Sequence, residues 1–468
     1  MAETRPYGRL DRSFGSWFKP ILALLVGGLF IYLMIRILDS RDSSLEQGNG
    51  KLKTARVFGN SMAPTWFGKH YQLICQECGY VNRFADESFP APRIFCGNCA
   101  QAIATQQVQQ RPGDDVEYRE VGTVKRWDVV LVREPDEPLR VIKRVIGLPG
   151  EKIKIFQGDV WINEERIERS LEDLWQTKVL VHDDSSKTFE SRWPSLEIEG
   201  DERKWIYYRH QEPWRPSGSQ AETAVEDASR AGKVDPLTDW MSADPAYSGP
   251  LWRTSDTILE LEFQIAGEGT LELFRPASTG QASPDDREGD LESGLLQRSR
   301  LWELRWRSDS LELGGKSLKI RKAKNVEQRQ AMVRLRWIVA CCDNRLWSRL
   351  FVEDAQGRRS GELREEVAAS EAVLENVDSK STPTALWSNT LWLIAHRGEL
   401  QWEQKRLYRD IYFRSAARES ARQEPLEREL KGYFLMGDNQ PISLDSREKK
   451  GWELGVPRRW IEGVIEAR

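Results

Sequence analysis

Apolar and polar side chains alternate with a period of two along much of this chain. Seven segments carry the pattern: 128–133, 140–147, 152–162, 257–263, 269–274, 301–306 and 333–338. Successive side chains of a strand point to opposite faces of a sheet, so such a pattern buries one face. Pro and Gly turns separate the segments, and a final strand is expected at 460–465. We therefore expect a mostly β fold without an internal repeat.

Length and charge narrow the classes of protein further. A chain of 468 residues has room for about three domains of ordinary size. Charged residues make up 30% and hydrophobic residues 39%, with a formal net charge of -4. These values exclude a disordered tail and argue against a basic nucleic-acid-binding surface.

An apolar run near the N-terminus predicts a membrane anchor. Residues 20–35 carry no charge, and extended to Leu38 the run would cover roughly 28 Å as a helix. Lys19 and Arg36 sit where their side chains reach the headgroups. A cleavable signal peptide is the alternative, but no small-residue cleavage site follows the run. We assign residues 1–50 to a cytoplasmic tail, a transmembrane helix and a linker.

Three distant segments predict a nucleophile that works without histidine. Ser61 follows Gly59 in a turn, so its hydroxyl can project beside free backbone N–H groups. Lys143 lies within an apolar strand, where burial would lower its pKa and make it a usable general base. The third segment, 437–447, contains a Gly-Asp-Asn turn followed by serine, aspartate and arginine.

These segments resemble the sequence boxes of the type I signal peptidases, membrane-bound Ser/Lys endopeptidases that remove signal peptides from exported proteins. The nucleophile box is met by Gly59, Ser61 and Met62, with Pro and Thr following. Lys-Arg-Val-Ile-Gly-Leu-Pro-Gly is intact at 143–150, and Gly-Asp-Asn with Ser-x-Asp-Ser-Arg occupies 437–447. The Arg-Gly-Asp-Val-Val box is present at 126–130, with Trp127 replacing the glycine.

The resemblance implies a role for each matching residue. Ser61 would be the nucleophile, Lys143 the general base, and Ser443 the hydroxyl that orients the lysine. The remaining implied residues support the dyad or bind the oxyanion and substrate: Asp438, Asp445, Arg447, Gly59, Asn60 and Met62. Some family members have a serine at the position of Gly59, whose hydroxyl is a second donor to the oxyanion. Because this chain has glycine there, the second donor would have to be another backbone group or a water.

The resemblance also implies a domain plan and a location. The protease core would comprise residues 51–69, 106–168 and 432–468, interrupted by inserts at 70–105 and 169–431. The catalytic domain would lie outside the cell membrane with the N-terminus in the cytoplasm. Its expected partners are signal peptides of exported preproteins, membrane lipid and the secretion machinery, and no nucleic acid.

The first insert carries two Cys-x2-Cys pairs, Cys75 and Cys78 followed by Cys96 and Cys99. This spacing predicts a zinc ribbon with four thiolate ligands and a structural metal. Two disulfides are the alternative, which an oxidising exterior would favour. Catalysis itself requires no cofactor. Adjacent Cys341 and Cys342 are expected to be small core residues.

The second insert predicts a β-sandwich, with a pattern similar to concanavalin-like or laminin-G-like domains. It contains 13 of the 19 tryptophans. These side chains either fill the core or stack on sugars, so glycan binding is the functional alternative to a structural role.

Two further functions compete with the protease. One is an extracytoplasmic binding protein whose protease core is inactive; the other is a self-cleaving repressor of the Ser/Lys type. The apolar N-terminal run and the lack of a helix-turn-helix pattern argue against the repressor.

Overall fold

The computed structural model describes most of the chain beyond the N-terminal segment. The described residues are 52–86, 94–103, 108–120, 122–135, 137, 139–185, 192–197, 200–211, 237–244, 247, 251–252, 254, 256–276, 298–307, 309–319, 332–343, 345–353, 358–368, 373–375, 392–416 and 424–466. The predicted membrane anchor at 20–38 lies outside them. No helix within the described ranges combines the length and apolarity needed to cross a bilayer.

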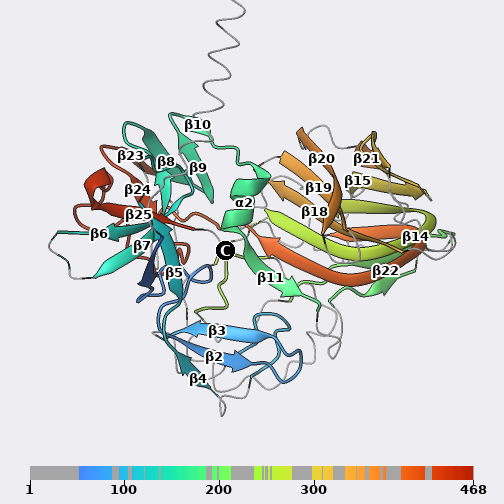
Figure 1. The fold of residues 1–468 in the computed structure, drawn as a ribbon, viewed down its shortest axis with the longest axis horizontal. Helices are drawn as coiled ribbons and strands as arrows, with labels where there is room; N and C mark the ends of the chain where they lie inside the picture. The colour runs from blue at the N-terminus through green and yellow to red at the C-terminus, as the bar shows by residue number, and fades with distance from the viewer. Residues whose placement is uncertain are drawn as a thin grey trace, which may run out of the picture.

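The fold is mostly β, as the alternation predicts, and one antiparallel sheet unites the two ends of the described chain (Figure 1). Its six strands, in spatial order, are β1 (Lys53–Arg56), β5 (Asp115–Arg119), β25 (Ile461–Ile465), β6 (Val129–Arg133), β7 (Arg140–Gly147) and β24 (Phe434–Met436). Strands were expected at 128–133, 140–147 and 460–465, and these three are confirmed. The pairing of β24 with β7 brings the Gly-Asp-Asn segment to the lysine strand.

A smaller sheet packs beside the first. It has the order β10 (Glu165–Arg166), β9 (Asp159–Ile162), β8 (Lys152–Phe156) and β23 (Leu426–Glu429). The pattern at 152–162 is therefore a hairpin, because Gln157 and Gly158 both adopt positive φ and reverse the chain. Strand β23 joins this sheet although the sequence plan placed its residues in the large insert.

The cysteine pairs lie on a small three-stranded sheet formed by β2 (His70–Ile74), β3 (Val81–Ala85) and β4 (Gln109–Arg111). Strand β4 pairs with β2, so this ribbon sheet continues past residue 105. In Figure 1 it lies below the six-stranded sheet, which we call the protease-like sheet, and below the large insert.

The large insert opens with α2 (Leu171–Thr177), whose N-terminus is closed by a capping box between Ser170 and Asp173. A twelve-stranded sheet follows. Its strands are β11 (Val179–Asp183), β12 (Ser195–Leu196), β13 (Lys204–Tyr207), β14 (Thr257–Pro276), β15 (Arg298–Arg307), β16 (Ser310–Leu313), β17 (Lys316–Lys319), β18 (Val333–Cys342), β19 (Arg345–Glu353), β20 (Arg359–Ala368), β21 (Val373–Glu375) and β22 (Leu393–Arg409).

The separate strands expected at 257–263 and 269–274 are one long strand, β14. Its pairing with β22 shifts between Ala266 and Thr270, and Gly267 there has a φ of 62°. The first half of β14 pairs with β18 and the second half with β15. The bulge lets one continuous strand serve both halves, whose apolar side chains share a single core.

Tryptophan fills the interior of this insert. Seven of its tryptophans are buried, namely Trp193, Trp205, Trp302, Trp306, Trp337, Trp347 and Trp392. A buried indole has no face open to a sugar, so these seven are core residues. Cys341 and Cys342 are buried among apolar neighbours, in keeping with small core residues.

Candidate active site

Ser61 lies in a turn that the protein core holds on both sides. The Ala63 N–H donates to the Asn60 carbonyl at 3.1 Å, and the Trp66 N–H donates to the Met62 carbonyl at 3.0 Å. The Met62 side chain is buried in the same apolar cluster as Ile142, the residue before Lys143. Ser61 itself is half-buried. The turn therefore presents Ser61 beside the lysine strand.

Lys143 is buried in β7, and its Nζ lies 2.9 Å from the Ser443 Oγ. Burial lowers the pKa of Lys143 to about 8, against the opposing effect of the Asp445 carboxylate. The neutral amine that a general base requires is thus populated near neutral pH. The structure brings together the two residues that the sequence assigned as base and orienting hydroxyl.

Asp438 joins all three motif segments. Its carboxylate accepts two hydrogen bonds from Arg144, at 2.8 and 2.7 Å, and one from the Thr65 hydroxyl at 2.5 Å. Asp438 and Arg144 are both almost completely buried. A buried ion pair of this kind holds its two segments in place, because separating the partners would leave each charge buried without a counter-charge. This ion pair therefore clamps the Ser61 turn, the lysine strand and the Gly-Asp-Asn turn together.

Asp445 and Arg447, two of the supporting residues that the resemblance implies, form a buried ion pair. The Arg447 Nε and Nη2 each lie 2.8 Å from a different carboxylate oxygen of Asp445. Burial alone would raise the pKa of Asp445, but Arg447 outweighs it and the pKa is lowered. The ionised carboxylate also accepts from the Gly437 N–H at 3.1 Å. The pair holds the segment that carries Ser443.

Gly437 separates the backbone of Ser61 from the side chain of Ser443. A Cβ added there would lie 2.3 Å from the Ser61 carbonyl oxygen and 2.3 Å from the Ser443 Oγ. Only glycine permits this approach. The Asn439 N–H, two residues later, donates to the Ser61 carbonyl at 2.9 Å. Within the described residues, no hydrogen bond joins the Ser61 hydroxyl to Lys143.

The proposed oxyanion region around Ser61 has fewer polar side chains than the surroundings of Lys143. Asn60 is buried, and its carboxamide bonds the Lys69 carbonyl and the Gly68 N–H, which fixes the turn around Ser61. Gly59 is exposed, and an added Cβ would meet nothing within 4 Å. No side-chain donor is therefore available at Gly59, although the space for one exists.

The sequence reasoning missed three residues of this site. Arg144 stood within the lysine box without a role, and Trp127 was noted only as a departure from glycine. Trp127 has a φ of 71°, the backbone conformation that favours glycine, and its carbonyl accepts from Arg144 at 2.9 Å. Asp244 of the large insert also reaches the site, and no motif surrounds it.

Comparison with known proteins finds relatives for part of this chain. Residues 50–202 match the family model described as signal peptidase, peptidase S26. The resemblance to type I signal peptidases is confirmed. Signal peptidase I of Rickettsia bellii (strain OSU 85-389) is 46% identical over 48 residues, which cover 10% of this chain and 17% of that protein. Signal peptidase I of Rickettsia prowazekii (strain Madrid E) is 47% identical over 47 residues, which cover 10% of this chain and 18% of that protein. The chain thus spans about a sixth of the length of the curated relatives it matches.

The large insert has only weak similarity to solved structures. A Lotus tetragonolobus seed lectin aligns with 48% of this chain and 96% of its own length, at 8% identity and a TM-score of 0.20. Peanut lectin has a TM-score of 0.17 at 10% identity, over 33% of this chain and 70% of its own. Scores this low establish neither the fold of the insert nor its ligand.

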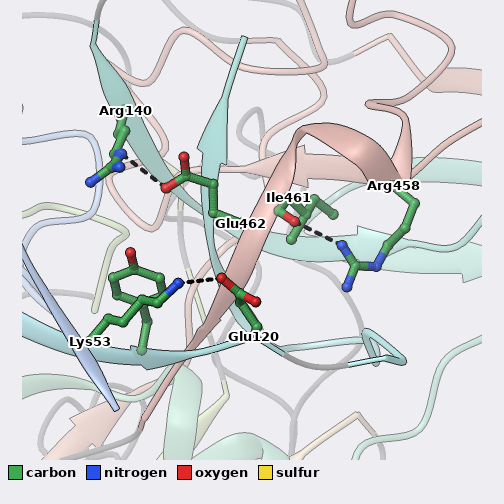
Figure 2. Close-up of a pocket in the computed structure, with 7 residues that line it drawn as sticks. Lys53, Glu120, Arg140, Arg458, Ile461 and Glu462 are labelled. Atoms are coloured by element: carbon green, nitrogen blue, oxygen red, sulfur yellow. Dashed lines mark hydrogen bonds and ion pairs between the residues drawn. The ribbon is translucent and has the colours of Figure 1, made fainter. Parts of the chain in front are cut away.

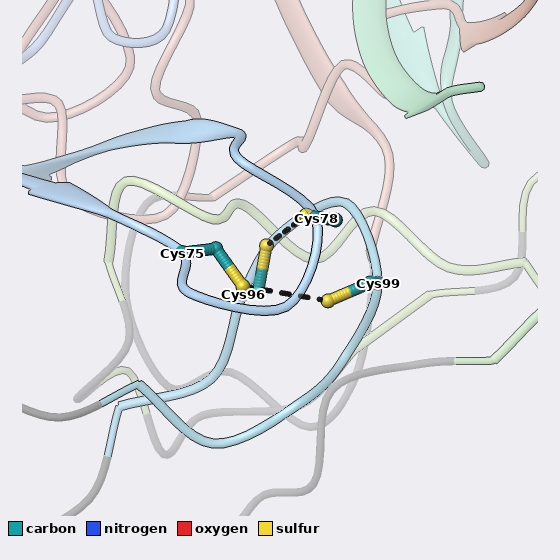
Figure 3. A group of neighbouring side chains, drawn as sticks. All are labelled: Cys75, Cys78, Cys96 and Cys99. Atoms are coloured by element: carbon teal, nitrogen blue, oxygen red, sulfur yellow. Dashed lines mark hydrogen bonds between the residues drawn. The ribbon is translucent and has the colours of Figure 1, made fainter. Parts of the chain in front are cut away.

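The four cysteine sulfurs of the ribbon sheet converge (Figure 3), all within 4.8 Å of one another. The Sγ atoms of Cys75 and Cys99 are 3.6 Å apart, as are those of Cys78 and Cys96. A disulfide requires about 2.05 Å, whereas four thiolates about 2.3 Å from one zinc ion lie about 3.8 Å apart. The four sulfurs are therefore placed as a metal site requires, and the two printed separations are longer than an S–S bond.

The surroundings of the cysteines also suit a metal. The Gly79 N–H bonds the Cys75 carbonyl and the Ala100 N–H bonds the Cys96 carbonyl, which forms a tight turn at each pair. The Asn82 Nδ2 lies 3.5 Å from the Cys96 Sγ. Hydrogen bonds among the thiols lower the pKa of Cys96 and raise the pKa values of Cys78 and Cys99, so they favour a thiolate at Cys96 alone. The Asn82 amide lies outside the set of four thiols and would orient the Cys96 thiolate in a metal site.

The structure also has a surface cavity of about 400 Å³, whose lining residues are drawn in Figure 2. Its lining residues are Lys53, Tyr118, Glu120, Arg140, Arg458, Ile461 and Glu462. Arg140 and Glu462 form an ion pair at 2.9 Å, and Lys53 pairs with Glu120. These two ion pairs neutralise four of the five charges, and the Arg458 guanidinium donates to the Ile461 carbonyl at 2.8 Å. Neither Ser61 nor Lys143 lines the cavity.

Proposed function

We propose that this chain is a membrane-anchored signal peptidase that cleaves signal peptides from exported preproteins through a Ser61 nucleophile and a Lys143 general base. The observation that carries the proposal is the buried Lys143 amine, 2.9 Å from Ser443 and beside the turn that bears Ser61. An inactive core would have no need to keep an amine buried in this setting. The family match at residues 50–202 supports the same reaction class.

The proposed reaction begins with the neutral Lys143 amine. Its lone pair takes the proton of Ser61 as the Ser61 oxygen attacks the scissile carbonyl carbon. The Ser61 N–H, which bonds no described group, stabilises the oxyanion. The peptide C–N bond then breaks, Lys143 returns the proton to the departing amine, and an acyl-enzyme remains. Water, activated by Lys143, hydrolyses the ester and frees Ser61.

The substrate would bind as an added strand. Strand β1 is an edge of the six-stranded sheet and ends five residues before Ser61, so its open side leads to the nucleophile. Phe58, between that strand and Ser61, is 62% exposed. Shallow contacts along this edge would accept small residues before the cleaved bond.

The location and partners follow from the same proposal. Signal peptides emerge across the membrane, so the catalytic domain would face the outside and the N-terminal tail the cytoplasm. Membrane lipid and the secretion machinery would be its neighbours there. The four-cysteine site would hold a structural zinc ion and take no part in the chemistry.

Incubation of the full-length protein in detergent with a preprotein tests the proposal. We expect one cut after a small residue and covalent labelling of Ser61 by a serine-directed fluorophosphonate. Ser61→Ala should abolish both, with a melting temperature within about 2 °C of the parent. Ser310→Ala, which removes a hydroxyl of the large insert, should change neither. Cleavage by the Ser61 variant would contradict the assignment.

The pH dependence of cleavage provides a second test. The base must be neutral, and the pKa of Lys143 is lowered to about 8 by burial. The value of kcat/KM should therefore rise about tenfold per unit from pH 6 to 7.5 and level off above pH 8.5. A lysine at the ordinary value would keep the rate rising past pH 10. A profile that rises with a midpoint above pH 10 would refute the lowered pKa.

A further inference from the structure

A segment of the large insert, residues 237–244, reaches into the protease-like site. In Figure 1 it runs through the centre of the molecule, between the ribbon sheet, the six-stranded sheet and the twelve-stranded sheet of the insert. Ala243 packs with Ala63 and Phe67 of the nucleophile turn, and its carbonyl accepts from the Ala85 N–H at 2.8 Å. Met241 is buried in the core cluster that contains Trp127. The segment therefore contacts the turn, the core and the ribbon at once.

Asp244, at the end of this segment, contacts the Gly-Asp-Asn turn. Its Oδ2 accepts from the Asn439 Nδ2 at 2.5 Å, and Asp244 is only 2% exposed. The same Asn439 Nδ2 donates to the Asn60 carbonyl at 3.3 Å, while the Asn439 N–H donates to the Ser61 carbonyl. Asn439 thus donates to the carbonyls of Asn60 and Ser61, and its side-chain amide also donates to the Asp244 carboxylate.

The chemistry of the carboxylate fixes which way the Asn439 amide points. An ionised aspartate only accepts hydrogen bonds, and so does the Asn60 carbonyl. Both therefore require the NH2 group of Asn439, whose Oδ1 has no hydrogen-bond partner. Without Asp244 the amide could rotate by a half-turn and place Oδ1 against the Asn60 carbonyl. That repulsion would displace the turn that carries Ser61.

The segment is held rigidly from the side of the insert. Asp239 and Arg414 form a buried ion pair at 2.7 Å. Arg409, at the end of β22, donates to the carbonyls of Asp239 and Trp240 at 3.1 and 3.0 Å. The insert therefore anchors the segment that carries Asp244 at Asp239 and Trp240.

We infer that Asp244 of the large insert is a positioning residue for the proposed Ser61 nucleophile, acting through Asn439. The inference rests on the proposed function. It gives the insert a part in catalysis: the insert supplies a carboxylate that the sequence motifs lack, so the protease-like core is complete only when the insert is folded against it.

Steady-state cleavage by full-length Asp244→Asn protein tests the inference, with a fluorogenic peptide that has small residues before the cut. We expect kcat to fall about tenfold to a hundredfold, because small displacements of a nucleophile cost that much. KM should change less than twofold, and zinc content should not change. Asp201→Asn, which alters a carboxylate bonded within the insert to Arg203 and Trp205, should leave kcat unchanged.

An exchanged pair separates positioning from stability. Asp244→Asn combined with Asn439→Asp restores a donor and an acceptor between the two positions but places a carboxylate against the Asn60 carbonyl. The melting temperature should recover while kcat stays low. Recovery of both, or an Asp244→Asn kcat within twofold of the parent, would overturn the inference. If the parent itself fails to cleave, the proposed function fails, and the inference with it.

Discussion

Replacing Lys143 with methionine is expected to lower kcat/KM by about 10⁴-fold or more while the protein stays folded. Burial lowers the pKa of the Lys143 amine to about 8, which suits a general base, and methionine has nearly its volume without a titratable atom. Within the described residues Lys143 forms no ion pair, so its loss leaves no buried charge stranded. Ser443 loses one hydrogen bond, at a cost of about 1 kcal/mol in the free energy of unfolding. Peptide cleavage and thermal unfolding of the same sample measure both effects.

Lys178 offers a matched control for this substitution. Burial lowers its pKa to about 8, as for Lys143, but its Nζ lies over the Trp175 ring at 3.8 Å, within the large insert. Lys178→Met should therefore leave kcat/KM within about twofold of the parent, because a lowered pKa without a neighbouring nucleophile performs no catalysis. Equal losses in the two variants would mean that Lys143 acts through stability and not as the base.

The segments around Ser61 and Lys143 were predictable because short stretches of sequence carry their motifs and their strand alternation. Residues 143–150 form an uninterrupted match, and alternation alone located β6, β7 and β25. Strand pairing then brings the lysine strand against β24, which leads directly into the Gly-Asp-Asn turn. The sequence could not show that Arg144, next to Lys143 and on the opposite face of the strand, clamps Asp438.

The contribution of the insert could not be predicted. Asp244 stands in a segment without strand alternation or a family motif, and 195 residues separate it from Asn439. Its role depends on long-range packing through Arg409 and Arg414, which carry no local signal. The single strand β14 was divided for a related reason: Gly267 and Gly269 interrupt the alternation as a turn does, but in the structure they form a bulge.

The zinc prediction rested on spacing, and the structure adds distances that spacing could not provide. Cys75 and Cys78 lie on the first turn and Cys96 and Cys99 on the second, 18 to 24 residues apart across the facing pairs. Spacing alone predicts the metal but leaves two disulfides as the alternative. The 3.6 Å separations of the sulfurs favour the metal, since a covalent S–S bond is far shorter.

Loss of the proposed zinc ion should have the second largest effect on stability and cleavage. Full-length protein is expected to contain one zinc ion per chain by elemental analysis, and Cys96→Ser should reduce the zinc content to near zero. The four cysteines are part of the small apolar core of the ribbon, so loss of the ion removes the main support of that sheet. Structural zinc sites contribute about 10 kcal/mol or more to the folding of small modules, so the ribbon should unfold on its own.

Unfolding of the ribbon should also reach the nucleophile. A Cβ on Gly97, between two ligands, would lie 2.6 Å from the Ser242 Cβ, so the second cysteine turn packs directly on the segment that carries Asp244. Cys96→Ser should therefore lower kcat about tenfold or more through the displaced segment, as well as the melting temperature. Cys341→Ala, at a buried cysteine outside the site, should keep both zinc and kcat. A zinc-free parent whose four thiols become titratable only after reduction would instead establish two disulfides, since thiolates released from a metal react without a reductant.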